Sequence, residues 1–172
     1  MAFIFAITIL IIAALLTVLV GIFEIYSLYA MIKAAPFVPT ASNLVGTMVK
    51  LAELKSDDNL MDLGSGDGRI VKAAAPLVAR AVGVEINPVL YWLSRWRLRQ
   101  VKNVEIRRED LWQTDLSNID VLAVYFINNK MEQLAGKIKR EMKLGSRIVS
   151  HGFQFPNWNW VRKDDKVYLY IV

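Results

Sequence analysis

The chain has 172 residues, of which 55% are hydrophobic and 22% charged, and its formal net charge is +5. This length accommodates one domain and a short extra segment, and it excludes a second large domain. The absence of cysteine excludes disulfides and thiolate metal sites, and the single histidine, His151, argues against a zinc cluster, so we expect no metal. The modest positive charge is spread along the chain and does not by itself select a partner.

The first segment, residues 2–23, carries no charged side chain. Its 22 residues would span ~33 Å as a helix, which is enough for a hydrocarbon core of roughly 30 Å. A cleaved signal peptide would have a basic start and a shorter apolar stretch, and a buried core helix would be apolar on one stripe only. We therefore expect a single-pass transmembrane anchor over residues 1–33, with the lipid bilayer as a partner. All lysines and arginines follow residue 23, so the positive-inside rule predicts a cytoplasmic position for the rest of the chain.

Two prolines follow the expected anchor. Pro36 and Pro39 fix φ and push the residues before them towards extended backbone, so we expect a proline-containing linker over residues 34–42. Apolar residues at helical spacing then predict a helix over residues 43–54, with Thr40 or Ser42 as its N-cap. We expect this helix to pack on the domain that follows it.

From residue 59 onward, strand and helix patterns alternate, which predicts a parallel sheet. The expected strands cover residues 59–63, 79–85, 104–107, 121–126 and 147–151, and the expected helices cover 70–78, 88–101 and 131–142. The tail differs, because Val161 and the alternating residues 166–172 predict an antiparallel β-hairpin with its turn at 163–165. We therefore expect one α/β domain over residues 43–172, with a Rossmann-like sheet, helices on both faces and a C-terminal hairpin.

A glycine-rich turn lies directly between the first expected strand and the next helix. Its glycines permit positive φ and let a ligand approach the backbone, where free N–H groups begin the helix. A dinucleotide fingerprint needs G-x-G-x-x-G, but position 69 is arginine, so the pattern is G-x-G-x-G. A tight turn that binds nothing is the simpler alternative. We expect a cofactor site formed by Asp62, Gly64, Ser65, Gly66, Asp67 and Gly68.

Two acidic positions lie where such a ligand would continue. Glu85 ends the second strand about 20 residues after the turn, where its carboxylate can accept both hydroxyls of a ribose. Asp110 follows the third strand and can accept from an adenine amino group while Leu111 or Trp112 packs on the ring. Each acid alone has the simpler interpretation of a solvated loop residue. Because ligands of open α/β sheets bind at the carboxyl edge of the strands, we expect these loops to share one site.

These residues resemble those of class I S-adenosylmethionine-dependent methyltransferases, in which residues 62–68 would be the cofactor loop, Glu85 the ribose acid and Asp110 the adenine contact. The resemblance narrows to the small membrane-associated protein-lysine methyltransferases, whose eukaryotic members modify the ATP synthase c-subunit and the adenine nucleotide translocase. The segments that carry it are residues 36–40, 62–71, 85–88, 110–112 and 153–156. The resemblance implies S-adenosylmethionine as the cofactor and a class I methyltransferase sheet. It departs at residues 126–131, which match no substrate motif that we can assign.

A lysine acceptor would be methylated by direct displacement, in which the neutral amine lines up with the methyl–sulfur bond. Asn128 and Asn129 follow the fourth strand, and their side-chain oxygens are candidates for orienting the amine, with a turn role as the alternative. Phe37 and Pro39 are candidates for the wall of the acceptor pocket, as the resemblance suggests, or for packing where the anchor joins the domain. His151 is a candidate base, although a lone histidine at a strand end is more often structural.

Tryptophans and arginines alternate between Trp92 and Arg99, a pattern that suits a lipid headgroup surface, an acidic partner or RNA. We favour buried tryptophans and solvated arginines over an RNA site, and we expect no nucleic-acid partner. The leading hypothesis is a methyltransferase that acts on a lysine of a membrane or membrane-proximal protein. The alternatives are methylation of a lipid or small hydrophobic molecule, and a non-catalytic anchored nucleotide-binding module.

Overall fold

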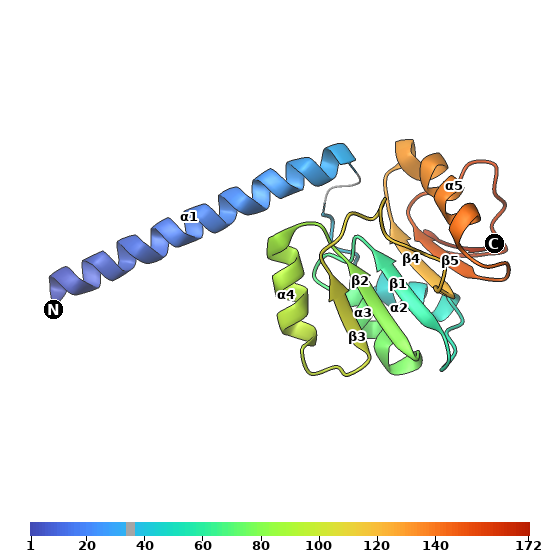
Figure 1. Cartoon of the computed structure of the whole chain (residues 1–172), viewed down its shortest axis with the longest axis horizontal. Coiled ribbons are helices and arrows are strands. Elements are labelled where there is room, and N and C mark those ends of the chain that lie inside the picture. Colours follow the sequence, from blue (N-terminus) through green and yellow to red (C-terminus); the bar gives the residue numbers. More distant parts are fainter. Residues whose placement is uncertain (34–36) are drawn as a thin grey trace.

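The computed structural model describes residues 1–33 and 37–172. Residues 34–36, which include Pro36 and the start of the expected linker, lie outside the described residues. Helix α1 (Ala2–Lys33) extends away from an α/β domain formed by α2 to β7 (Figure 1). Its stretch Ala2–Tyr29 is long and apolar enough to cross a membrane, and its most apolar part is not buried against the described protein. This exposure distinguishes α1 from the core helix of a globular domain.

Within the described residues, seven strands form one sheet in the order β3-β2-β1-β4-β5-β7-β6. The five strands β3, β2, β1, β4 and β5 are parallel, whereas β7 is antiparallel to both β5 and β6. Their bounds are β1 Asn59–Leu63, β2 Arg80–Val84, β3 Val104–Arg107, β4 Val121–Tyr125, β5 Arg147–His151, β6 Arg162–Asp164 and β7 Val167–Ile171. The expected Rossmann-like sheet and terminal antiparallel hairpin are confirmed.

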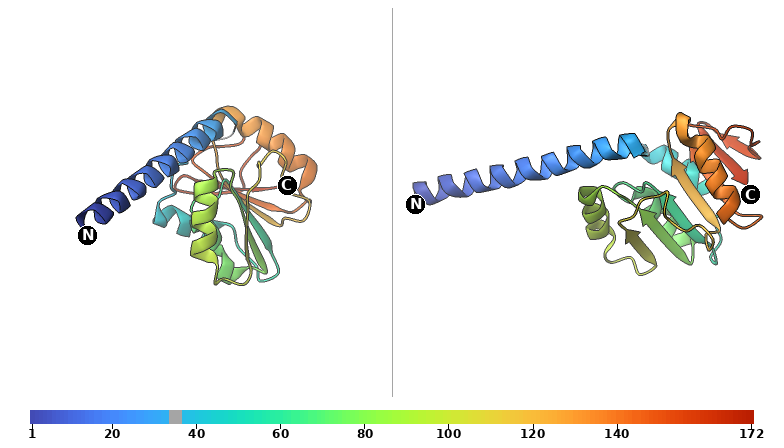
Figure 2. Two further views of the ribbon diagram at one scale, coloured as in Figure 1. Left: turned by 60° about the vertical axis from the view of Figure 1, so that its left-hand side comes forward. Right: turned by 45° about the horizontal axis from the view of Figure 1, so that its top comes forward.

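Helices cover both faces of this sheet (Figures 1 and 2). Met48 of α2 (Ser42–Leu51), Val71 of α3 (Arg69–Ala74) and Leu98 of α4 (Pro88–Leu98) belong to one buried cluster. Leu134 and Ile138 of α5 (Met131–Glu141) belong to the other cluster. The central strands are apolar along their length because both of their faces are covered. Two 3₁₀ turns, η1 (Ala75–Leu77) and η2 (Asn128–Lys130), adjoin α3 and α5.

Several expected boundaries were wrong. The helix expected to reach residue 78 ends as α-helix at Ala74 and continues as η1, because Pro76 lacks an N–H and its ring crowds the carbonyl four residues earlier. The helix expected to reach residue 101 ends at Leu98. The N-cap of α2 is Ala41, with no capping side chain, rather than Thr40 or Ser42.

The hairpin turn also lies later than expected. Strand β6 includes Lys163 and Asp164, so the chain reverses at Asp165, which has a φ of 51°. Aspartate tolerates this left-handed conformation better than most residues, which explains why the turn forms there.

The expectation that Trp92 and Trp96 are buried was wrong, since they are 62% and 63% exposed. Helix α4 instead buries Leu90, Ser94 and Leu98. These three residues recur every four positions on one face of the helix, and that periodicity leaves the tryptophans on the opposite face.

Candidate functional site: a nucleotide cofactor cavity

The glycine turn connects β1 to α3 at the carboxyl edge of the sheet. Gly66 has a φ of 55°, and a side-chain Cβ at this position would collide with the ring of Phe37. Gly68 has a φ of 80° and precedes α3, where a Cβ would lie 2.8 Å from Cδ1 of Leu98 and 3.1 Å from Cβ of Ser94. The turn therefore needs glycine for its backbone conformation and for its close approach to Phe37 and to α4.

Glu85 follows β2 and holds the turn from the side. Its Oε2 accepts a hydrogen bond from the N–H of Gly66 at 2.8 Å, and its Oε1 accepts from the N–H of Asn87 at 2.7 Å. Asn87 caps α4, because its Oδ1 accepts from the N–H of Val89 at 2.9 Å. Burial raises the pKa of Glu85, and the hydrogen bonds from Asn87 and Gly66 oppose that rise. The carboxylate is therefore fixed in place before any ligand arrives, and its remaining lone pairs can accept from ribose hydroxyls.

Asp62, near the end of β1, and Asp67, in the glycine turn, have different surroundings. Burial, together with the nearby charges of Glu85 and Asp67, raises the pKa of Asp62 to about 8. Asp67 instead accepts hydrogen bonds from Arg69 at 2.8 Å and from Arg97 at 2.6 Å, and its hydrogen bond with Arg69 is the main cause of its lowered pKa. Asp62 therefore lies on the cavity wall as a carboxyl group whose ionisation is disfavoured, whereas Asp67 ties the loop to Arg69 and Arg97.

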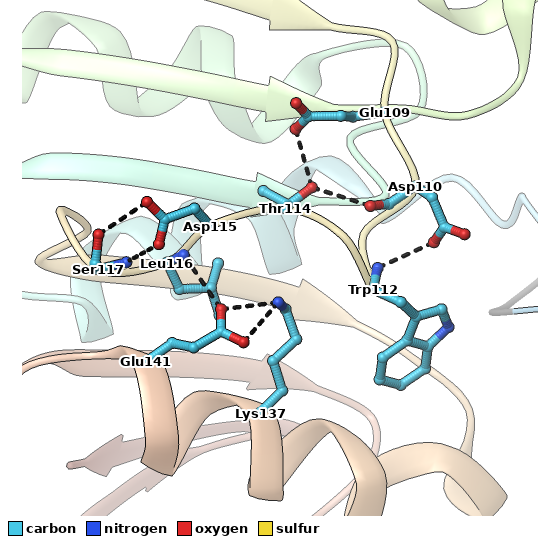
Figure 3. A network of polar contacts seen from close by, with 9 residues as sticks. All are labelled: Glu109, Asp110, Trp112, Thr114, Asp115, Leu116, Ser117, Lys137 and Glu141. Atoms are coloured by element: carbon cyan, nitrogen blue, oxygen red, sulfur yellow. Dashed lines mark hydrogen bonds and ion pairs between the residues drawn. The ribbon is translucent and has the colours of Figure 1, made fainter.

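The loop after β3 is held in shape by its own polar groups (Figure 3). The Oδ1 of Asp110 accepts from the N–H of Trp112 at 3.0 Å, and the hydroxyl of Thr114 donates to Oε2 of Glu109 at 3.0 Å. Leu111 is buried and lines the cavity together with Asp110. Trp112 packs edge-on against Phe126, 5.8 Å between ring centroids. Of the two side chains expected to pack on an adenine, Leu111 is the one on the cavity wall.

One cavity brings together eight of the nine residues expected to bind the cofactor: Asp62, Gly64, Ser65, Gly66, Asp67, Glu85, Asp110 and Leu111. The ninth, Gly68, closes the loop behind the wall and faces α4. Phe37 and Pro39 also line the cavity, as does Ser27 from α1. The strap formed by residues 37–40 is fastened to the loop, because Nη1 of Arg69 donates to the carbonyl of Thr40 at 2.6 Å.

Sequence reasoning missed several residues of the wall. Tyr125 and Phe126 line the cavity from the end of β4, and Ser27 lines it from α1. The rule that ligands bind at the carboxyl edge of parallel strands could have identified the first two. Asn128 and Asn129 follow β4 on η2 but are exposed, and neither belongs to the described lining of the cavity.

His151 is not part of the cavity lining, and its ring packs at a tilt against Tyr125, with 4.1 Å between centroids. Burial lowers its pKa, and Nδ1 is buried without a hydrogen-bond partner among the described residues. This position agrees better with a role in supporting Tyr125 than with direct proton transfer at the cavity.

The residues present fit an adenosine cofactor. Gly64 leaves open space at the backbone, the Ser65 hydroxyl is buried without a partner among the described residues, and Glu85 offers its carboxylate. No group of three or more potential metal ligands occurs within residues 1–33 and 37–172. This sheet order, with a glycine turn after β1 and an acid after β2, defines a class I S-adenosylmethionine-dependent methyltransferase.

Comparisons with known proteins give the family. The model of the ANTKMT methyltransferase domain matches residues 62–162. A protein-lysine N-methyltransferase from Saccharolobus islandicus is 34% identical over 157 residues, covering 80% of this chain and 93% of that protein. The lysine N-methyltransferase of the ATP synthase c-subunit from Rattus norvegicus is 37% identical over 126 residues, which cover 72% of this chain and 58% of the rat protein. The chain belongs to this family of protein-lysine methyltransferases.

A solved structure agrees with the fold and the cofactor. A protein from Salinibacter ruber, described as an RNA methyltransferase and crystallised with S-adenosyl-L-homocysteine, superposes with a TM-score of 0.74. It is 34% identical and covers 78% of this chain and 93% of its own. S-adenosylhomocysteine is what remains of S-adenosylmethionine after methyl transfer, so S-adenosylmethionine is the methyl donor of this class of protein.

Proposed function

We propose that this chain is a membrane-anchored enzyme that methylates a lysine of a membrane or membrane-proximal protein. The observation that carries the proposal is that Ser27 of α1 lines the same cavity as Asp62 and Glu85. The stretch of α1 that is long enough to cross a membrane runs to Tyr29. The cavity therefore lies beside the end of the apolar stretch, where a lysine at the bilayer surface is within reach.

The proposal divides the chain into an anchor at residues 1–33, a linker at residues 34–42 and a catalytic domain at residues 43–172. Because the lysines and arginines follow the apolar stretch, the positive-inside rule supports a cytoplasmic catalytic domain. The name of the rat relative supports a lysine acceptor, since that protein is named for a lysine of the ATP synthase c-subunit.

S-adenosylmethionine, when bound, supplies an electrophilic methyl group carried on a positively charged sulfur. The lysine nitrogen forms a bond to this carbon as the carbon–sulfur bond breaks, and the nitrogen must be uncharged to do so. An unperturbed lysine has a pKa of about 10.4 and is mostly protonated at neutral pH. Phe37, Pro39 and Phe126 give the cavity an apolar stretch of wall. Such a wall lowers the pKa of the incoming amine and favours its neutral form.

Orientation of the amine needs a hydrogen-bond acceptor near the end of β4. Tyr125 is the polar side chain that the cavity wall offers there. Asn128 and Asn129 follow within four residues, and their role as amine acceptors stays a prediction. Alignment of the amine with the methyl group is the main catalytic task, and the chain needs no covalent nucleophile of its own.

The test is methyl transfer by the full chain reconstituted in phospholipid vesicles. Tritiated S-adenosylmethionine is added together with solubilised and re-reconstituted membrane proteins of the source cells. We expect tritium in protein and, by mass spectrometry, on lysine. Glu85→Ala should abolish transfer, and the control Glu132→Ala, an exposed glutamate of α5, should retain it.

Other distributions of the label would contradict the proposal. Tritium in the lipid extract would identify a lipid methyltransferase, and tritium in added RNA would identify an RNA methyltransferase. Cofactor binding by calorimetry without transfer to any fraction would leave a non-catalytic nucleotide-binding module.

A further inference from the structure

The outer face of α4 is unusual for a helix of a globular domain. Trp92 and Trp96 lie four residues apart on this face and are 62% and 63% exposed, and Leu93 beside them is 40% exposed. The buried face of the same helix carries Leu90, Ser94 and Leu98. An exposed pair of tryptophans flanked by an exposed leucine costs free energy in water, so this face is built for contact with something other than water.

We propose that the outer face of α4 rests on the phospholipid headgroups, so that the α/β domain docks on the bilayer beside its own anchor. This inference rests on the proposed membrane anchoring of α1. The occupant is an anionic lipid surface.

Arginines accompany the two tryptophans. The guanidinium of Arg95 lies over the ring of Trp92 at 5.6 Å, and that of Arg99 lies over the ring of Trp96 at 4.8 Å. Indole rings partition to the boundary between acyl chains and headgroups, and arginine pairs with lipid phosphates. Arg97 differs from the other two, because it binds Asp67 of the cofactor loop at 2.6 Å. The cations available to lipid on this face are therefore Arg95 and Arg99.

Contacts with α1 place α4 at headgroup level. The Asn87 side chain, which caps α4, donates to the carbonyl of Phe23 at 3.4 Å. Nη2 of Arg108 donates to the Tyr26 hydroxyl at 3.0 Å. If the uncharged residues 2–23 fill the roughly 30 Å of hydrocarbon, Phe23 lies at the boundary of the acyl region and Tyr26 among the headgroups. Helix α4 begins at that same level.

The direction of α4 fits this placement. In Figures 1 and 2, α4 lies on the side of the α/β domain from which α1 extends, and its axis runs across that of α1. If α1 crosses the bilayer, α4 then lies along the membrane surface, as interfacial amphipathic helices do. The tryptophan face points away from the sheet, because the buried face points towards it.

Docking through α4 would set the height of the cavity. Asp67 of the cofactor loop pairs with Arg97, and Gly68 packs closely on Ser94 and Leu98, so the loop is joined directly to the docking helix. Two attachments to the bilayer, α1 and α4, would prevent the domain from swinging about the end of the anchor. The acceptor lysine is then expected at a fixed distance from the membrane surface.

The chain contains no cysteine, so single cysteines can carry a nitroxide label at chosen positions. We would label Leu93→Cys on the α4 face, Leu10→Cys on α1 and Leu144→Cys, which is 90% exposed at the far end of the domain. The full chain would be reconstituted in vesicles of phosphatidylcholine and phosphatidylserine. Collision rates with oxygen, which concentrates in the bilayer, and with a water-soluble nickel complex would report the depth of each label.

We expect the Leu10 label to meet mainly oxygen, the Leu144 label mainly nickel, and the Leu93 label to be shielded from nickel at headgroup depth. That shielding should be lost with Trp92→Ala and Trp96→Ala together, and reduced with Arg95→Glu and Arg99→Glu or without phosphatidylserine. None of these four side chains belongs to the described lining of the cavity, so cofactor affinity should be unchanged in the variants.

A Leu93 label as accessible to nickel as the Leu144 label, with the Leu10 label in lipid, would overturn the docking inference alone. A Leu10 label in water would overturn the anchor and the docking together. Shielding of the Leu93 label by added RNA in detergent, but not by vesicles, would identify the face as an RNA site and also overturn the inference. Turnover is not measured, so a failure of docking is distinct from a failure of methyl transfer.

Discussion

Asp62 is the carboxyl group whose ionisation the fold resists most clearly. Its pKa is raised to about 8 by burial and by the neighbouring carboxylates of Glu85 and Asp67. The sulfonium of S-adenosylmethionine is positively charged, so its presence in the cavity would favour the ionised form of Asp62 and release a proton. We therefore expect affinity for S-adenosylmethionine to rise with pH up to about 8 and to level off above it.

The binding enthalpy of S-adenosylmethionine, measured by calorimetry in two buffers of different ionisation enthalpy, would give the number of protons released on binding. Asp62→Asn should remove this proton release and weaken binding above pH 8. S-adenosylhomocysteine lacks the sulfonium charge and should show a smaller pH dependence. Equal pH dependence for both ligands in the wild type would contradict the role assigned to Asp62.

The same raised pKa also affects folding. A carboxyl group with a folded-state pKa above its unfolded value of 3.8 contributes stability that is fully present below 3.8 and is lost as pH rises to about 8. Asp62→Asn removes this penalty. We therefore expect the Asp62→Asn variant in detergent to have a higher Tm than the wild type at pH 8 and the same Tm near pH 4. A difference in Tm that does not grow with pH would contradict this explanation.

Gly66 makes a conformational demand that can be tested against a matched glycine. In the Gly66→Ala variant, residue 66 would leave its positive φ and the turn would move away from Phe37. Cofactor binding would then have to restore the left-handed conformation of this residue. The left-handed conformation costs ~1–2 kcal/mol for a non-glycine residue, so we expect affinity to fall about tenfold or more. Gly46 lies in α2, where an added Cβ would meet nothing within 4 Å. Gly46→Ala should stabilise the fold by about 0.5–1 kcal/mol and leave affinity unchanged in the same calorimetric assay.

At the scale of elements, a buried ion pair joins α2, β1 and β5. Arg147 of β5 pairs with Asp58, just before β1, and also donates to the carbonyls of Ala52 and Glu53 after α2. Arg147→Met would leave Asp58 buried without its cation, which costs about 3–5 kcal/mol. We expect urea unfolding of the detergent-solubilised chain to show a decrease of that size in the free energy of unfolding.

The exposed pair between Arg162 and Glu53 provides the control. Arg162→Met removes the same charge at the surface, where an ion pair contributes about 0–1 kcal/mol. If Arg147→Met and Arg162→Met lowered the free energy of unfolding by similar amounts, burial would not explain the contribution of the Arg147–Asp58 pair to stability.

At the scale of the whole molecule, the anchor is predicted to hold the enzyme on the bilayer. Ile12→Arg and Leu16→Arg together place two charges in the apolar stretch, and each costs about 2.5–3.5 kcal/mol at the centre of a membrane helix. We expect the double variant to be released from membranes by an alkaline wash that leaves the wild type bound. Leu77→Arg and Leu144→Arg add the same charge at exposed positions of the α/β domain and should stay bound. Retention of the α1 variant would contradict anchoring by this helix.

Much of the fold follows from local patterns. The strands at residues 59–63, 104–107 and 147–151 have the expected bounds, because short apolar runs between turn residues suit a buried parallel sheet. The helix over residues 70–78 was predicted too long, since Pro76 changes the hydrogen-bonding pattern within an otherwise helical sequence. The burial of Trp92 and Trp96 was predicted wrongly, because the apolar residues of α4 can form either of two faces. Packing against Gly68 and against the core cluster on which Val104 and Ile106 of β3 also pack selects the face with Leu98 and Ser94.

The sequence by itself determined the glycine turn, the acids after β2 and β3, and the apolar helix, because turns, strand ends and hydrophobic runs are set by residues that are neighbours along the chain. Only the tertiary structure decided that Ser27, Phe37 and Tyr125 share one cavity wall, and that Asp67 is bound by arginines rather than left to a ligand. Tyr125 and Arg97 lie tens of positions from the glycine turn, and Ser27 and Phe37 precede the sheet, so the packing of α1, β4 and α4 around the turn is what brings them together. The tertiary structure likewise decided that a row of tryptophans faces outward beside the helix long enough to cross a membrane.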